Sequence, residues 1–161
     1  MGTGLIAWSG GSESAIFPHH PVTLSHRTDF ALRTLMYLGR VAAEKESRRV
    51  ASAEIARVFD IPLNHLVKIV HQLAQHGYVH TTRGPGGGVE LARSPEDIRI
   101  GQVIDDFQGP LQLHDCVSSP GLCAIESFCK LQSIFRQGDA LQRDFLNRHT
   151  LADVIPAATE A

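Results

Sequence analysis

A glycine-rich interruption between two short β-type segments constrains the fold of this chain more than any other feature. Residues 78–82 and 89–92 both favour strand, and the stretch between them reads Arg83-Gly84-Pro85-Gly86-Gly87-Gly88. Glycine adopts backbone conformations that other residues avoid, so three consecutive glycines allow a sharp and narrow turn. The sequence therefore predicts a tight β-hairpin with the glycines at its tip.

Three helices are predicted before this hairpin, and the first two are described here. The first covers about 28–44, with Thr28 as its N-cap and Asp29 in its first turn, where the helix dipole favours an acid. Ser52 is expected to cap a short second helix that ends near Phe59. The apolar side chains expected to face inward from these two helices are Ala31, Leu35, Leu38, Ala42, Ile55, Ala56, Val58 and Phe59.

The third helix, over about 62–76, is the most informative segment. Pro62 suits the first helical position, and Gly77 suits the left-handed residue that ends a helix. One face carries the apolar stripe Leu66, Ile69, Val70 and Leu73. The opposite face carries the polar side chains Asn64, His65, Lys68, His71, Gln72 and Gln75.

Three helices followed by a hairpin, in this order, form a winged helix-turn-helix, which we place at residues 25–93. Polar groups on the third helix can read base edges in the major groove of double-stranded DNA, Lys68 and the Ser52 hydroxyl suit phosphates, and Arg83 suits a narrow minor groove. A solvated helix face is the alternative reading of the same polar stripe. The predicted DNA-binding residues are Ser52, Asn64, His65, Lys68, His71, Gln72, Arg83, Gly84, Gly86 and Gly87.

The charge distribution agrees with this assignment although the chain as a whole has a net charge of −2. Residues 48–93 carry a local charge of +3, and the residues from Ser94 onward carry −5. A positive middle and a negative end are what a DNA-reading unit followed by an assembly unit would show.

The second half is predicted to hold a helix from Ser94 to about Phe107, a loop over 111–129 and a long helix over 126–148, with a last turn over 150–155. The long helix has an apolar face made of Phe128, Leu131, Ile134, Phe135, Leu141 and Phe145. The fold class is therefore mainly α with a small β-hairpin, and the first 24 residues are expected to be a flexible leader.

All three cysteines of the chain fall in that loop, as Cys116-x6-Cys123-x5-Cys129. An odd number of clustered cysteines favours a shared ligand role over structural disulfides. Zinc sites usually pair their ligands at C-x2–4-C, whereas wide and irregular spacing suits an iron–sulfur cluster held by thiolates. A thiol-only redox switch and an adventitious zinc site remain alternatives.

Other functional classes receive less support. The chain shows no signal peptide and no apolar run long enough to span a membrane, so we expect a cytoplasmic protein. It shows no paired carboxylates, nucleophile elbow or phosphate loop, so we do not expect an enzyme. A winged helix that binds protein instead of DNA is the remaining alternative.

Several stretches, in order along the chain, resemble one known family. They are Thr28-Asp29-Phe30-Ala31-Leu32-Arg33, Asn64-His65-Leu66-Val67-Lys68-Ile69, the glycine-rich hairpin, Ile98-Arg99-Ile100-Gly101-Gln102-Val103-Ile104 and Thr150-Leu151-Ala152-Asp153. From about Leu24 to Ile155 the sequence is similar to the Rrf2 family of bacterial winged-helix iron–sulfur regulators.

The resemblance implies a homodimer, paired through the long helix, that represses transcription from a palindromic operator. Residues 94–161 would then form a cluster-binding loop and a dimerisation helix. Cys116, Cys123 and Cys129 match the family's cluster ligands, for a [4Fe-4S] or [2Fe-2S] cluster. Asp29 matches an aspartate that in some members supplies the fourth ligand from the partner subunit.

The resemblance also separates two branches of the family. The regulators of cluster biogenesis have a histidine three residues after the last cysteine, where this chain has Gln132. This difference favours the branch that senses nitric oxide, and an iron- or redox-responsive regulator of the same family is the alternative.

Overall fold

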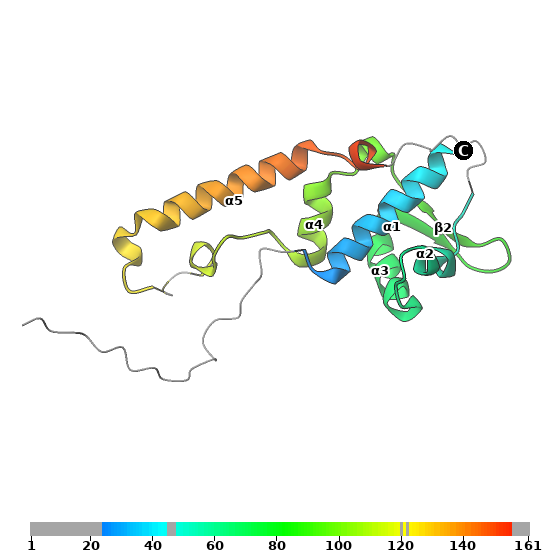
Figure 1. The fold of residues 1–161 in the computed structure, drawn as a ribbon, viewed down its shortest axis with the longest axis horizontal. Helices are drawn as coiled ribbons and strands as arrows, with labels where there is room; N and C mark the ends of the chain where they lie inside the picture. Colours follow the sequence, from blue (N-terminus) through cyan, green and yellow to red (C-terminus); the bar gives the residue numbers. More distant parts are fainter. Residues whose placement is uncertain (1–23, 45–47, 120, 122, 156–161) are drawn as a thin grey trace, which may run out of the picture.

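The computed structural model describes residues 24–44, 48–119, 121 and 123–155, which form a mainly helical structure with one two-stranded sheet (Figure 1). The predicted fold class is thereby confirmed, and the predicted leader lies outside the described residues except for Leu24. The regular elements are α1 (His26–Ala43), α2 (Ser52–Val58), α3 (Leu63–Gln75), β1 (Val79–Thr82), β2 (Gly88–Leu91), α4 (Ile100–Gln108) and α5 (Lys130–Arg148). Among the described residues no helix has the length and apolar character needed to cross a membrane.

The winged helix-turn-helix has one hydrophobic core. Leu35 of α1, Ile55 of α2 and Leu66 and Leu73 of α3 are fully buried, as is Tyr78 at the start of the hairpin. The apolar stripe predicted for α3 is buried over its whole length. Because burial of apolar surface is the main favourable contribution to folding, this stripe fixes which face of α3 remains available to a ligand.

The hairpin pairs β1 with β2 in antiparallel register, with Val79 opposite Leu91. Val50, just before α2, exchanges two backbone hydrogen bonds of 2.9 and 2.8 Å with Val89, so the chain entering α2 is attached to the hairpin. At the tip Gly84 and Gly86 have φ angles of +96° and +76°, a region that glycine enters without steric cost. The sequence prediction of a tight glycine hairpin is confirmed.

Several predicted helix ends are wrong by a few residues. Ser25, not Thr28, caps α1, because its Oγ accepts the Thr28 backbone N–H at 3.1 Å. Val41 is buried in place of the exposed Ala42. A cap only one turn earlier shifts the start of a helix without changing its apolar period, so the pattern alone did not separate these choices.

The start of α2 and α3 also differs from the prediction. Ser52 is the first residue of α2 and Ala51 its N-cap, and Pro62 is the N-cap of α3 instead of its first residue. Val58 is exposed, because a helix as short as α2 turns only its Ile55 side to the core.

The helix predicted from Ser94 to Phe107 is interrupted. A 3₁₀ turn (Pro95–Asp97) is followed by extended backbone, and α4 begins only at Ile100. The reason is long-range pairing, since the Leu151 N–H donates to the Ile98 carbonyl at 2.7 Å and the Ile100 N–H donates to the His149 carbonyl at 3.0 Å. The end of α5 and the residues after it are therefore attached to the segment that leads into α4.

The long helix α5 begins far from the helix-turn-helix core and packs against α4 near its C-terminal end, and the cysteine loop lies near its first turn (Figure 1). It begins at Lys130 instead of 126, because Glu126–Phe128 forms a separate 3₁₀ turn and Cys129 has extended backbone. Most of the predicted apolar face is exposed in the single chain: Leu131, Ile134, Leu141 and Phe145 are between 53% and 70% exposed. Such a stripe on a helix indicates a surface that another protein element covers.

Candidate nucleic-acid interface and cysteine loop

The structure gathers some of the predicted DNA-binding residues between α2, α3 and the hairpin. Ser52, His71 and Arg83 line one open hollow of about 290 Å³, together with Thr81 and Thr82 of β1. The two threonines are absent from the sequence prediction, since nothing in the pattern distinguished the outward positions of β1. Valine side chains line the rest of this hollow, and the hydroxyl and basic groups on it are donors that phosphate oxygens accept from.

His65 and Lys68 lie on another part of α3. They line a hollow of about 480 Å³ with His26 and Arg27 of α1. These two basic residues were missed because the sequence placed the start of the first helix after them. Asn64 is exposed at the start of α3, as are Gly84 and Gly86 at the wing tip. Gly87 is less exposed, and its backbone approaches the Thr82 carbonyl so closely that a Cβ would lie 2.3 Å from that oxygen.

Gln72 lines neither of these two hollows. Its side-chain oxygen accepts hydrogen bonds from the Arg27 guanidinium, and its Nε2 donates to the Asp106 carbonyl at 3.4 Å. The amide is therefore engaged between α1, α3 and α4 in this conformation. Its predicted role in DNA binding stays a prediction, and the structure adds a connection between helices.

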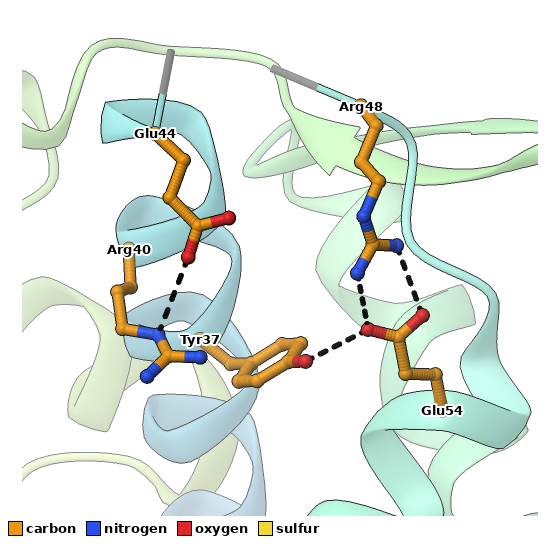
Figure 2. A network of polar contacts seen from close by, with 5 residues as sticks. All are labelled: Tyr37, Arg40, Glu44, Arg48 and Glu54. Carbon is orange, nitrogen blue, oxygen red and sulfur yellow. Dashed lines mark hydrogen bonds and ion pairs between the residues drawn. The ribbon is translucent and has the colours of Figure 1, made fainter. Parts of the chain in front are cut away.

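A polar network attaches α2 to α1 (Figure 2). Arg48 donates two hydrogen bonds of 2.9 and 2.6 Å to the Glu54 carboxylate, and the Tyr37 hydroxyl donates a third at 2.8 Å. These bonds, those from Arg48 first, lower the pKa of Glu54 from 4.5 to about 2. Arg40 and Glu44 form an ion pair of 4.0 Å on the adjacent turn of α1. Glu54 thus stays ionised and holds α2 in place beside the hollow that Ser52 lines.

A second polar contact joins the segment just after α3 to α4. The Tyr78 hydroxyl donates to Asp106 Oδ2 at 2.6 Å, and His76 Nδ1 lies 3.7 Å from the same oxygen. Burial, followed by the bond to Asp106, raises the pKa of Tyr78. Arg93 covers the Tyr78 ring at 4.9 Å and donates to the His76 carbonyl. These contacts connect the end of α3, the hairpin and α4.

The cysteine loop connects α4 to α5. All three cysteines are unpaired thiols; Cys123 is exposed, whereas Cys116 and Cys129 are half-buried. Cys116 lies in a 3₁₀ turn (Asp115–Val117), and Cys129 is the N-cap residue of α5. Two of the three cysteines therefore lie in defined secondary structure or directly at its end.

The donor set fits an iron–sulfur cluster in its chemistry, because thiolates are the ligands that such clusters use and the segment supplies three. Within the described part of the chain no three His, Cys, Asp or Glu side chains are arranged to hold a single metal ion. Cys116, Cys123 and Cys129 are near one another in the sequence, but they do not form such a group in this structure.

Asp29 is placed on the first turn of α1. Its carboxylate accepts a hydrogen bond from Arg33 Nε at 2.9 Å and is 35% exposed. The expectation that it supplies a ligand across a dimer concerns two chains and stays a prediction.

Comparison with known proteins agrees with this architecture. A regulator named "HTH-type transcriptional regulator NsrR" from Bacillus subtilis is 35% identical over 133 residues, which is 82% of this chain and 89% of the relative. Among solved structures, CymR, the global cysteine regulator of B. subtilis, superposes with a TM-score of 0.66 at 23% identity, covering 83% of this chain and 95% of that one. IscR from T. potens superposes with a TM-score of 0.67 at 22% identity, covering 86% and 92%. These two structures support the fold.

A family model described as "Iron-dependent Transcriptional regulator" matches residues 24–157, which span the helix-turn-helix, the wing, the cysteine loop and α5. Its members are transcriptional regulators and not enzymes. With a match of this extent and a curated relative at 35% identity, the chain belongs to the Rrf2 family of transcriptional regulators.

Proposed function

We propose that this chain is a repressor that binds a palindromic operator as a homodimer and releases it in response to nitric oxide, sensed through an iron–sulfur cluster on Cys116, Cys123 and Cys129. The observation that carries the proposal is the position of the cysteine loop. Along the chain all three thiols lie between α4, which is hydrogen-bonded to α3, and α5, which has an exposed apolar face.

The reading half supplies the DNA contacts. Asn64, His65 and His71 lie exposed on α3 and offer hydrogen-bonding groups to base edges in the major groove. Lys68 and Ser52 are assigned to phosphates, which position the protein without reading sequence. Arg83, at a tip made slim by Gly84, Gly86 and Gly87, is assigned to the minor groove.

The dimer is assigned to α5. Its exposed stripe, Leu131, Ile134, Leu141 and Phe145, follows the spacing of one helix face, and a second copy of the same helix covers such a stripe in a symmetric pair. A two-fold protein matches a palindromic operator. In this assembly Asp29 of the partner subunit would complete the ligand set.

When bound, the cluster supplies iron that nitric oxide can attack. The chain's own contribution is to couple the order of the cysteine loop to the reading helices. Cys129 caps α5, and the end of α5 is hydrogen-bonded to the segment before α4. An ordered loop therefore favours one placement of α5 and of the two readers, and a disordered loop removes this preference.

A crossed experiment tests the two halves separately. A duplex selected from a random-sequence pool by anaerobically reconstituted wild-type protein is titrated with wild type, Cys116→Ala and Lys68→Ala, before and after nitric oxide. Cys116→Ala is expected to lose the cluster absorbance and the operator affinity while its reader stays folded by circular dichroism. Lys68→Ala is expected to keep the absorbance and the nitric oxide response but to bind more weakly, with a smaller salt dependence.

The sensing proposal is wrong if Cys116→Ala binds the operator tightly and still responds to nitric oxide. An iron-responsive regulator is the second candidate, because the family model carries the description "iron-dependent". That candidate is favoured if chelation of iron releases the operator and nitric oxide does not.

A further inference from the structure

The segment that leads to the first cysteine is fixed on one face of α5. The Leu113 N–H donates to the Asp139 carboxylate at 2.8 Å, and the Asp139 side chain is buried. One turn nearer the start of α5, the His114 ring stacks on Phe135 with centroids 6.0 Å apart and planes inclined by 15°. Two successive residues of the loop are therefore attached to two successive turns of the helix.

The backbone of Cys116 is held on both sides. Its N–H donates to His114 Nδ1 at 3.2 Å, and its carbonyl accepts a hydrogen bond from Gln132 Nε2 at 2.5 Å. Gln132 precedes Phe135 by three residues and lies on the same face of α5. Cys129 joins the start of this helix directly, so Cys116 and Cys129 are both positioned relative to the first turn of α5.

Cys123 has a different environment. It is exposed, and its carbonyl accepts from the Glu126 N–H at 3.1 Å, which is a bond within the loop. The neighbouring Gly121 N–H donates to the Glu126 carboxylate, again within the loop. These bonds shape the loop locally and do not fix it on α5.

We propose that Gln132 is a positioning residue that holds the Cys116 backbone on the first turns of α5 before any metal arrives. This inference rests on the proposed function, since it concerns one of the proposed ligands. A donor that is fixed in advance loses less conformational entropy when it binds, so a Cys116 held by Gln132 favours assembly at this position.

The test compares Gln132→Leu with Gln137→Leu in the full-length, metal-free protein under anaerobic conditions. Leucine removes the Nε2 donor without adding charge, and Gln137 is exposed on another side of the same helix. Hydrogen exchange of the segment 113–117 is followed by mass spectrometry. Exchange in Gln132→Leu is expected to be about three- to tenfold faster than in wild type, as loss of one hydrogen bond implies, and unchanged in Gln137→Leu.

A second measurement follows the growth of cluster absorbance after addition of ferrous iron and sulfide. Gln132→Leu is expected to assemble more slowly by a similar factor, while circular dichroism shows α5 intact. Equal exchange of 113–117 in Gln132→Leu and wild type overturns the inference, as does equal acceleration in Gln137→Leu. If wild type takes up no iron and sulfide, the proposed function fails, and the exchange measurement still decides whether Gln132 fixes Cys116.

Discussion

Replacing Leu141 by alanine should weaken the proposed dimer by about two orders of magnitude. Leu→Ala removes about 2 kcal/mol of transfer free energy from a fully buried side chain. In the single chain Leu141 is 70% exposed, so about 1.5 kcal/mol of this is available at an interface. A symmetric dimer contains the position twice, which gives about 3 kcal/mol and about a 100-fold higher dissociation constant.

The measurement is the sedimentation velocity of wild type and Leu141→Ala over a wide range of protein concentrations. Arg136→Ala, exposed on another side of α5, is the matched control and should dimerise like wild type. Circular dichroism verifies that both variants keep the helix. If Leu141→Ala dimerises within about twofold of wild type, its side chain stays outside the interface, and the assignment of this face to the second copy is refuted.

Two further predictions concern the polar contacts of the reading half. Tyr78→Phe should lower the free energy of unfolding by about 1–2 kcal/mol, measured by urea denaturation, because a buried hydroxyl loses its 2.6 Å bond to Asp106; an unchanged midpoint would contradict this. For Glu54 the pKa falls from 4.5 to about 2 on folding, so its contribution is fully present above pH 4.5 and is lost as the pH falls toward 2. Since the Arg48 side chain is 50% exposed, solvent screening leaves about 1 kcal/mol, and the stability difference between wild type and Glu54→Gln should be largest near pH 7 and shrink below pH 4.5 in urea titrations.

The helix-turn-helix and the wing were predictable from local sequence because their signals are local. The stripe Leu66, Ile69, Val70 and Leu73 needs only the helical period. Positive φ angles occur at glycines that the sequence marks as turn positions, namely Gly77, Gly84 and Gly86. The interruption of the predicted 94–107 helix was not predictable in this way. It depends on backbone pairing between Ile98 and Leu151, more than fifty residues apart, which no local period reports.

The same distinction between local signals and long-range contacts applies to the candidate site. The cysteines were visible as a cluster in the sequence, and so was the polar face of α3. The roles that depend on tertiary contacts were not visible: Gln72 has the period of a reading residue but bonds to Arg27 and to Asp106. Likewise Gln132 showed only which family branch is favoured, and its bond to the Cys116 carbonyl depends on how the loop returns to α5.

The bonds of Gln72 and Tyr78 to α4 have a consequence for how such a regulator can discriminate between promoters. In the proposed dimer, each DNA-reading unit would move as a rigid body because α3 is joined to α1, α4 and the hairpin, and its preference for bases within a half-site would not depend on the signal. Under this proposal the signal would alter only the distance and angle between the two units, which have to match half-sites about 34 Å apart or a multiple of this. The length of the spacer between the two half-sites, more than the base sequence of the spacer, would then determine how strongly repression at a promoter changes with the signal.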